Sequence, residues 1–275
     1  MGSLGRRVEV AQGLTATVGD TPLVEFTSPT EFCGGVRLLG KAEMLSMGGS
    51  VKDRAAAYMV EQGEKLGLLK PRLDCRRNGK HEYCTCSDCP KQGRRIPFYA
   101  SSHSLLDLAI QGYKCLIVMI RTISIDNQNL SRLFGAELVL TEPCSLTDPK
   151  HFYQVAKRLP EERGGFYVNQ FENVDDSEAS YRTTEIWEQT NGQVTVFCCA
   201  AGTGRTIAGV STYLKERDPN IQVNVIDCPT SILYPYLKSG EMGCKLEVEL
   251  KGIEGIRTDR LTANFREQRL TMLSR

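Results

Sequence analysis

The sequence predicts an α/β fold. Short segments rich in β-branched residues alternate with longer segments whose apolar residues recur at helical spacing, and this alternation is typical of βαβ units around a parallel sheet. The chain has 275 residues, of which 41% are hydrophobic and 24% are charged. This composition indicates a folded globular protein, with enough residues for one large domain or two smaller ones.

The first expected unit consists of a strand, a glycine turn and a helix. We expect the strand over residues 36–41 and the turn at Gly48 and Gly49. Ser50 can then cap a helix that ends at Gly67. Two further units follow. The first has a strand at 115–120, a helix at 125–134 and a strand at 137–140. The second has a buried strand at 194–199, a glycine turn at 202–206, a helix at 206–217 and a strand at 222–226.

Residues 71–97 differ from the rest of the chain, because they are rich in basic residues and cysteines and almost without aliphatic side chains. Zinc could be held there by Cys75, His81, Cys84, Cys86 and Cys89. Their spacing lacks the two Cys-x-x-Cys pairs of strong zinc sites. We interpret the stretch as an atypical insert, disordered or from a misread coding segment, and predict no metal site.

Charge and hydropathy exclude several classes of partner. The net charge of +1 gives no general attraction to nucleic acid or to an anionic membrane. No apolar run approaches the roughly 20 residues of a membrane span, and the N-terminus lacks the apolar stretch of a signal peptide. The eleven cysteines, several within apolar runs, indicate buried thiols in a reducing compartment. We expect a cytoplasmic protein, with a mitochondrial location as the alternative.

Lys52 is the first candidate for chemistry. It follows the Gly48-Gly49 turn in the expected first turn of a helix. A helix N-terminus carries partial positive charge and disfavours a cation, so a lysine there has a lowered pKa and is a better nucleophile. This position suits Schiff-base formation, although a solvated surface lysine is the simpler interpretation of the motif alone.

The second candidate is the glycine turn over residues 202–206, between a strand and a helix. Its small residues let the backbone approach a ligand, and N–H groups at the start of a helix bind phosphate without a cation. The turn therefore predicts a phosphate site, and an ordinary tight turn is the alternative.

The two motifs belong to a longer series of matches. They include Gly-Gly-Ser-Val-Lys-Asp-Arg at 48–54 and Gly-Thr-Gly at 202–204, together with residues 19–24, 39–43, 112–114, 135–139, 169–173, 185–187, 214–216, 254–256 and 260–264. Through these motifs, nearly along its whole length, the chain resembles the cysteine synthases of the cysteine synthase and cystathionine β-synthase family of pyridoxal-phosphate enzymes.

The resemblance implies a role for each matched residue. Lys52 would form the Schiff base with pyridoxal 5′-phosphate and move the α-proton of the substrate. The cofactor phosphate would be held by Gly202, Thr203, Gly204 and Thr206. The implied reaction is β-replacement, in which an activated serine such as O-acetylserine loses its leaving group and sulfide takes its place to give cysteine. The implied assembly is a homodimer.

Two family segments are altered or missing. The loop that holds the substrate carboxylate and the cofactor's ring hydroxyl should precede strand 115–120, where the chain has Ser101, Ser102 and His103. We expect Ser101 and Ser102 to bind the substrate and His103 to hydrogen-bond the cofactor. The family's Ser or Thr at the pyridine nitrogen belongs to a C-terminal segment beyond Arg275, so we interpret the chain as truncated and assign no residue that role.

Arg205 stands in the turn where the family has glycine. If that position needs a φ that only glycine tolerates, Arg205 strains the turn by about 1–2 kcal/mol. Alternatively its guanidinium adds a contact to the phosphate. We favour strain, which predicts that Arg205→Gly tightens cofactor binding.

The resemblance also implies two domains, each with a mainly parallel sheet flanked by helices. The smaller would comprise residues 39–147 and include the insert, and the larger, which binds the cofactor phosphate, would combine residues 1–38 with 148–275. A catalytically impaired pseudoenzyme, a serine/threonine deaminase-like lyase and an unrelated zinc-binding module are the alternatives. Retention of Lys52 argues against the last, whereas the altered substrate loop keeps the pseudoenzyme open.

Overall fold

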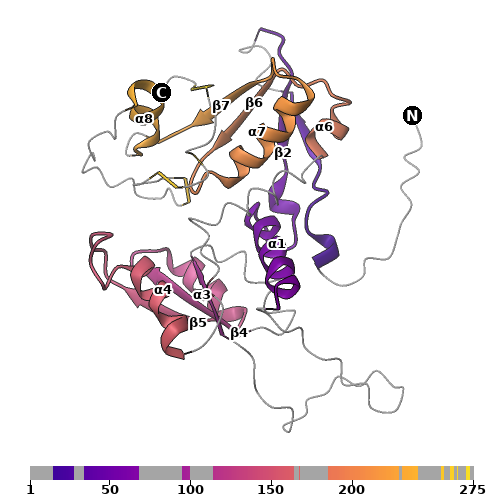
Figure 1. Ribbon diagram of the computed structural model, residues 1–275. Coiled ribbons are helices and arrows are strands. Elements are labelled where there is room, and N and C mark those ends of the chain that lie inside the picture. Colours follow the sequence, from indigo (N-terminus) through magenta and orange to yellow (C-terminus); the bar gives the residue numbers. More distant parts are fainter. Residues whose placement is uncertain are drawn as a thin grey trace, which may run out of the picture.

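The computed structural model contains most of the expected strands and helices (Figure 1). It describes residues 15–27, 34–67, 95–99, 114–163, 167, 185–228, 231–240, 255–256, 261–262, 265 and 271–272. The expected strand at 222–226 is present with those bounds, and the expected helix at 206–217 begins one residue earlier.

An antiparallel hairpin precedes the first long helix. After a 3-10 turn over Thr15–Thr17, β1 (Leu23–Phe26) pairs with β2 (Leu38–Lys41), and a second 3-10 turn follows over Glu43–Leu45. The expected strand at 36–41 therefore begins two residues later and pairs antiparallel with β1, outside any parallel sheet. Its pairing is close, since a Cβ at Gly40 would lie 2.5 Å from the Phe26 ring.

Helix α1 (Lys52–Lys65) begins close to where the glycine turn predicted. Its alanine-rich sequence has high helix propensity, and Gly67, with φ of +68°, follows its last turn in the left-handed conformation that stops a helix. Ala56, Met59 and Val60 form the buried face of α1. Packing of this face in the apolar core positions α1 and therefore Lys52, its first residue.

The first parallel sheet has the order β3-β4-β5, with β3 (Arg95–Tyr99), β4 (Lys114–Ile120) and β5 (Glu137–Thr141). Because β3 begins at Arg95, the last three residues of the expected insert belong to this sheet. Helix α3 (Ile125–Leu133) joins β4 to β5, and the Ser124 hydroxyl accepts a hydrogen bond from the Asn127 N–H at its start.

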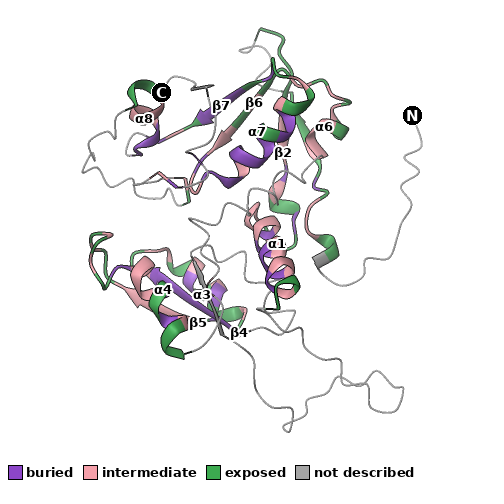
Figure 2. Cartoon of the chain, in the orientation of Figure 1, coloured by how far each residue is buried: buried purple, intermediate pink, exposed green. Residues whose placement is uncertain are grey.

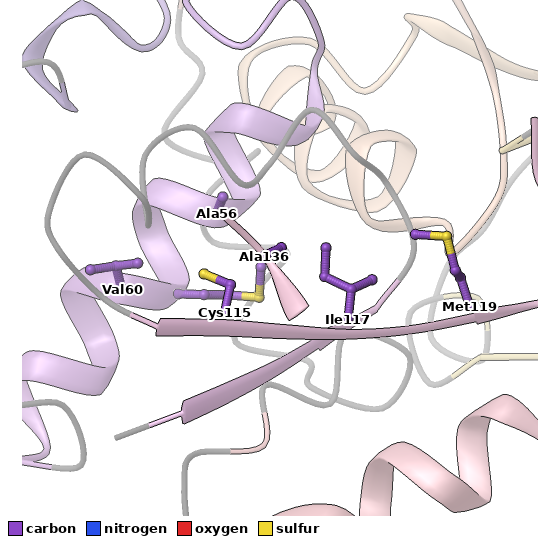
Figure 3. Close-up of a cluster of buried hydrophobic side chains, with 7 residues drawn as sticks. Ala56, Val60, Cys115, Ile117, Met119 and Ala136 are labelled. Carbon is purple, nitrogen blue, oxygen red and sulfur yellow. The ribbon is translucent and has the colours of Figure 1, made fainter. Parts of the chain in front are cut away.

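β4 is covered on both faces, as its uninterrupted apolar sequence predicts. Alternate residues Cys115, Ile117 and Met119 pack with α1 and Ala136 (Figure 3). The intervening residues Leu116 and Val118 pack on α4 (Phe152–Arg163). Helix α4 thus joins this unit although it follows residue 147, the expected end of the smaller domain, and the division into domains stays a prediction.

The second parallel sheet has the order β6-β7-β8, with β6 (Val196–Ala200), β7 (Gln222–Ile226) and β8 (Thr271–Met272). Helix α7 (Arg205–Arg217) joins β6 to β7, and its buried face contrasts with its exposed residues in Figure 2. Helix α8 (Leu233–Ser239) packs through Leu233. Helix α6 (Glu185–Gln189) packs on α7 through Ile186 and Trp187.

The expectation of a fully buried strand at 194–199 is wrong. The strand begins at Val196, and Val196 and Cys198 are exposed, whereas Phe197 and Cys199 pack into the core. Side chains alternate between the two faces of a strand, and the described helices cover β6 on one face only. Within the described ranges, no helix is long and apolar enough to cross a membrane.

Candidate active site

Lys52 is the first residue of α1, and the loop before it is held by hydrogen bonds. Gly49 has a φ of +78° and donates to the carbonyl of Ser46 at 2.8 Å. The Ser50 hydroxyl accepts the Lys52 N–H at 3.1 Å, but the N-cap residue is Val51, so the expectation that Ser50 is the N-cap is wrong by one residue. The buried carboxylate of Asp53 accepts the N–H of Gly48 at 2.8 Å, which fixes the turn against the helix.

The Lys52 ammonium group lies in a desolvated and positive environment. Protein atoms surround the side chain, which still retains some accessible surface, so it is recessed but not sealed. This burial, reinforced by the charge of Arg205, lowers the pKa of Lys52 to about 8. At pH 7 roughly a tenth of such amines are neutral, about 300 times the fraction at the ordinary pKa of 10.5.

The turn that joins β6 to α7 leaves no room for side chains at its two glycines. A Cβ at Gly202 would lie 2.3 Å from the carbonyl oxygen of Gly255. Gly204 has a φ of +80°, and a Cβ there would lie 2.5 Å from the Phe265 ring. The Thr262 hydroxyl donates a hydrogen bond to the carbonyl of Thr203 at 2.8 Å, which is a third contact that holds the turn in place.

We expect Gly204→Ala to lower the free energy of unfolding by roughly 2–4 kcal/mol. The left-handed backbone costs an L-residue about 1–2 kcal/mol, and overlap with Phe265 adds to it. Gly240→Ala is the matched control, because Gly240 has a φ of +74° but an added Cβ meets nothing within 4 Å. Chemical denaturation of both variants measures the difference, and equal losses would show that Phe265 yields without cost.

Arg205 departs from the expectation of strain. Arg205 is the first residue of α7 and does not have a positive φ. Among the described non-glycine residues, a positive φ occurs at Asp20 and Asn191. The backbone at position 205 therefore does not require glycine. The left-handed position is Gly204. The prediction of backbone strain at Arg205 is therefore wrong. The predicted tightening of cofactor binding by Arg205→Gly has no structural basis.

The structure brings the two candidate motifs together. Arg205 Nη1 lies 3.8 Å from Met59 Sδ on α1, which connects the start of α7 to the helix that begins with Lys52. Cys199, near the end of β6, is close enough to Lys52 for each to affect the other's pKa. Burial raises the pKa of the Cys199 thiol to about 11, so the thiol is neutral at pH 7.

Three of the expected site residues lie outside the described residues, namely Ser101, Ser102 and His103. The same holds for the cysteines and the histidine of the insert. The described residues contain no group of His, Cys, Asp and Glu side chains that could hold a metal ion.

Sequence reasoning missed an ionic network that attaches α1 to the rest of the molecule. Arg54, two residues after Lys52, donates from Nε to Glu43 at 2.8 Å and from Nη1 to Glu185 at 2.6 Å. Lys41 also donates to Glu185 at 2.5 Å, and the Thr21 hydroxyl donates to Glu43 at 2.7 Å. These residues fall in the matched motifs, but their pairing joins segments up to 144 positions apart.

Glu185 is the centre of this network. Burial by itself would raise the pKa of Glu185, but hydrogen bonds from Arg54, from Lys41 and from the Asp20 N–H outweigh burial and lower it to about 2. Because α6 packs on α7, the network fixes the first turn of α1 relative to the helix that starts at the glycine turn.

The comparisons with known proteins agree with these observations. Residues 14–266 match the family model described as pyridoxal-phosphate dependent enzyme. The chain is 35% identical to cysteine synthase 1 of Neurospora crassa over 94% of this chain and 65% of that protein, and 35% identical to cysteine synthase of Dictyostelium discoideum over 95% and 67%.

A solved structure shows the same fold. The chain is similar to O-acetyl serine sulfhydrylase isoform 3 from Entamoeba histolytica, with a TM-score of 0.77, 26% identity, and coverage of 100% of this chain and 75% of that one. These findings confirm the expected α/β class, a pyridoxal-phosphate-dependent enzyme similar to the cysteine synthases, and pyridoxal phosphate as its cofactor. The chain belongs to the family of pyridoxal-phosphate dependent enzymes.

Proposed function

We propose that this chain catalyses β-replacement on O-acetylserine, with sulfide as the nucleophile and cysteine as the product. The observation that carries the proposal is the placement of Lys52, recessed at the start of α1, beside the glycine turn that starts α7. The relatives named as cysteine synthases support it. The chain spans about two thirds of the length of these relatives, 65% and 67%.

The described residues fit pyridoxal phosphate. Gly202 and Gly204 pack directly against the Gly255 carbonyl and the Phe265 ring, where a Cβ would clash, and the N–H groups at the start of α7 that follow this turn are suited to a phosphate. We assign the cofactor phosphate to Gly202, Thr203, Gly204 and Thr206. Lys52 would hold the cofactor covalently. When bound, the cofactor supplies an electron-withdrawing ring that stabilises negative charge at the substrate α-carbon.

Lys52 also moves the substrate proton in this proposal. A pKa of about 8 places the amine near the pH range in which it can both accept and return a proton. Lys52 Nζ takes the proton from the α-carbon, acetate leaves the β-carbon, sulfide bonds to that carbon, and Lys52 returns the proton to the α-carbon. The hydrogen-bonded loop of Asp53 and Ser50 holds the start of α1 while the proton moves.

In this proposal Ser101 and Ser102 bind the substrate, and His103 hydrogen-bonds the cofactor, as the family resemblance implies. The serine/threonine deaminase and pseudoenzyme alternatives gain no support from the relatives named above, which are synthases.

The decisive experiment compares Lys52→Ala with Lys65→Ala, since Lys65 lies in the last turn of the same helix and pairs with Glu61 at the surface. We expect the wild type and Lys65→Ala to retain the visible absorbance of bound cofactor, to be labelled at Lys52 after borohydride reduction, and to form cysteine from O-acetylserine and sulfide. Lys52→Ala should lose all three.

The outcomes distinguish the alternatives. A wild-type protein that stays colourless in excess cofactor and gives no borohydride-trapped Lys52 would exclude both the enzyme and a cofactor-binding pseudoenzyme. Bound cofactor without cysteine formation would favour the pseudoenzyme, and release of pyruvate from serine would favour the deaminase.

The proposal includes a cytoplasmic homodimer. The resemblance to the family supports the homodimer, and the cysteine-rich composition supports a reducing compartment. Sedimentation equilibrium and cell fractionation would measure the two properties separately.

A further inference from the structure

We propose that Arg54 is a positioning residue for the reaction, which holds the Lys52 amine in place for proton transfer without touching the substrate or the cofactor. The inference rests on the proposed function. It gives the ionic network around Arg54 a role in the chemistry, in addition to its role in attaching α1 to the rest of the molecule.

Arg54 and Lys52 lie on opposite sides of α1. Two residues correspond to about 200° around a helix axis. Lys52 is on the side that continues into Ala56 and Met59, four and seven residues later, which are buried in the apolar core. Arg54 instead contacts the carboxylates of the network. The first turn of the helix is therefore held from behind, on the side away from the Lys52 amine.

Paired hydrogen bonds fix the guanidinium of Arg54. The carboxylate of Glu43 accepts from Nε and Nη2 at 2.8 and 2.9 Å, and that of Glu185 accepts from Nη1 and Nη2 at 2.6 and 3.0 Å. The Thr21 hydroxyl accepts a further hydrogen bond from Nη2 at 3.1 Å. Paired contacts of this kind define the plane of a guanidinium as well as its position.

The turn before β1 closes on this guanidinium. Gly19 has a φ of +92°, and a Cβ there would lie 2.9 Å from Arg54 Nη1 and 3.2 Å from Glu185 Oε1. The Asp20 N–H donates to Glu185 at 2.8 Å. The side chains of Arg54, Glu185 and Glu43 are only 10%, 17% and 19% exposed. Little room remains in which Arg54 could change its position.

Fixed geometry is what such a network adds to apolar packing. Replacing a whole buried ion pair by apolar residues often leaves stability unchanged, because desolvation opposes the attraction between the charges. The apolar contacts of α1 begin at Ala55, after Lys52, and helix ends open more readily than their middles. Misplacing a reacting group by about 1 Å can cost roughly a hundredfold in rate. The contacts of Arg54 confine the first turn and thereby the Lys52 amine.

The pKa of Lys52 reports on this confinement. Burial is the largest cause of its lowering to about 8, the charge of Arg205 on α7 adds to it, and Cys199 on β6 opposes it. Release of the first turn would admit water and raise the pKa toward 10.5. A rise from about 8 to about 9 lowers the neutral fraction at pH 8 about fivefold. A residue that only stabilised the fold would leave this pKa unchanged in the folded protein.

The test compares Arg54→Lys with the wild type. Reaction of the full cofactor-free chain with fluorodinitrobenzene, followed by mass spectrometry, gives the labelling rate of Lys52 against pH, with the half-exposed Lys65 as internal reference. Lysine keeps the charge at position 54 but lacks the planar fork. We expect the Lys52 profile to move to higher pH and the Lys65 profile to stay. With cofactor bound, kcat for cysteine formation should fall about ten- to hundredfold with little change in KM.

Leu159→Ala is the control for lost stability. Leu159 is buried on α4, which covers the face of β4 opposite to α1. This variant should unfold more easily but keep the Lys52 profile and the kcat of the wild type. Glu43→Gln is a second test variant, to be used if Arg54→Lys does not fold, because Arg54 then keeps Glu185. It should move the Lys52 profile in the same direction by a smaller amount.

The outcomes separate the positioning role from the proposed function. An unchanged Lys52 profile and kcat in folded Arg54→Lys would overturn the positioning role, as would an equal change in Leu159→Ala. A change in KM alone would also overturn it, because it would place Arg54 at the substrate. If the wild type binds no pyridoxal phosphate or forms no cysteine, the proposed function fails instead, and the labelling profiles of the cofactor-free protein still decide whether Arg54 positions Lys52.

Discussion

Replacing Lys52 by methionine should make the cofactor-free protein more stable at pH 7, although it removes the residue on which the proposed activity depends. Folding lowers the pKa of Lys52 from 10.5 to about 8, so the folded state holds the charged amine at a cost. The difference corresponds to an upper bound of about 3 kcal/mol. Methionine has a similar shape and no charge to desolvate.

The pH dependence of this gain follows from the two pKa values. Between pH 8 and 10.5 the unfolded chain binds more protons at this residue than the folded protein, so wild-type stability rises with pH in that window. The advantage of Lys52→Met is therefore full below about pH 8 and shrinks to nothing as pH rises through 10.5. Urea denaturation of both proteins across this range measures the difference.

Lys65→Met supplies the comparison, because Lys65 lies in the same helix with its side chain about half exposed. Its stability should change by less than about 1 kcal/mol, with no dependence on pH in this window. A Lys52→Met variant less stable than the wild type at pH 7 would show that the Lys52 amine makes a favourable interaction in the folded protein.

The elements predicted best from the sequence carry strong local signals. Strand β4 is a continuous apolar run, and α3 is preceded by a serine and followed by Gly135 with a φ of +79°. The hairpin of β1 and β2 was missed, because a short apolar strand shows no preference for a parallel or an antiparallel partner. The partner is determined by tertiary packing.

The same limit applies to the candidate site. The glycine patterns predicted that Lys52 and residues 202–206 lie at starts of helices, which is a local property. The conformation of Arg205 was predicted wrongly, because the sequence did not show that the left-handed residue of the turn is Gly204. The partners of Arg54 could not be predicted, since Glu43 and Glu185 approach it only when three separate segments fold together.

Glu185→Gln should lower the free energy of unfolding by roughly 2–4 kcal/mol at pH 7, because it leaves charged partners in a partly buried network. Arg54 would retain Glu43, but Lys41 would lose its carboxylate. Glutamine keeps the size of the side chain, so the loss reports on charge and hydrogen bonding. Since α6 packs on α7, the variant should also loosen the first turn of α1.

The pH dependence of the free energy of unfolding distinguishes the Glu185 network from ordinary surface ion pairs. The lowered pKa of Glu185, about 2, means that its stabilisation is present above pH 4.5 and is lost as pH falls toward 2. The difference between wild type and Glu185→Gln should therefore disappear across this window in denaturation experiments.

Glu142→Gln is the control for Glu185→Gln. It breaks the Arg121–Glu142 pair, whose side chains are 60% and 70% exposed, and should cost less than about 1 kcal/mol at pH 7. Hydrogen exchange at the start of α1 adds a local measurement, in which Glu185→Gln but not Glu142→Gln should speed exchange. If the two variants lose equal stability and exchange alike, water screens the Glu185 network as fully as a surface pair, and α1 must be positioned by its apolar contacts with β4.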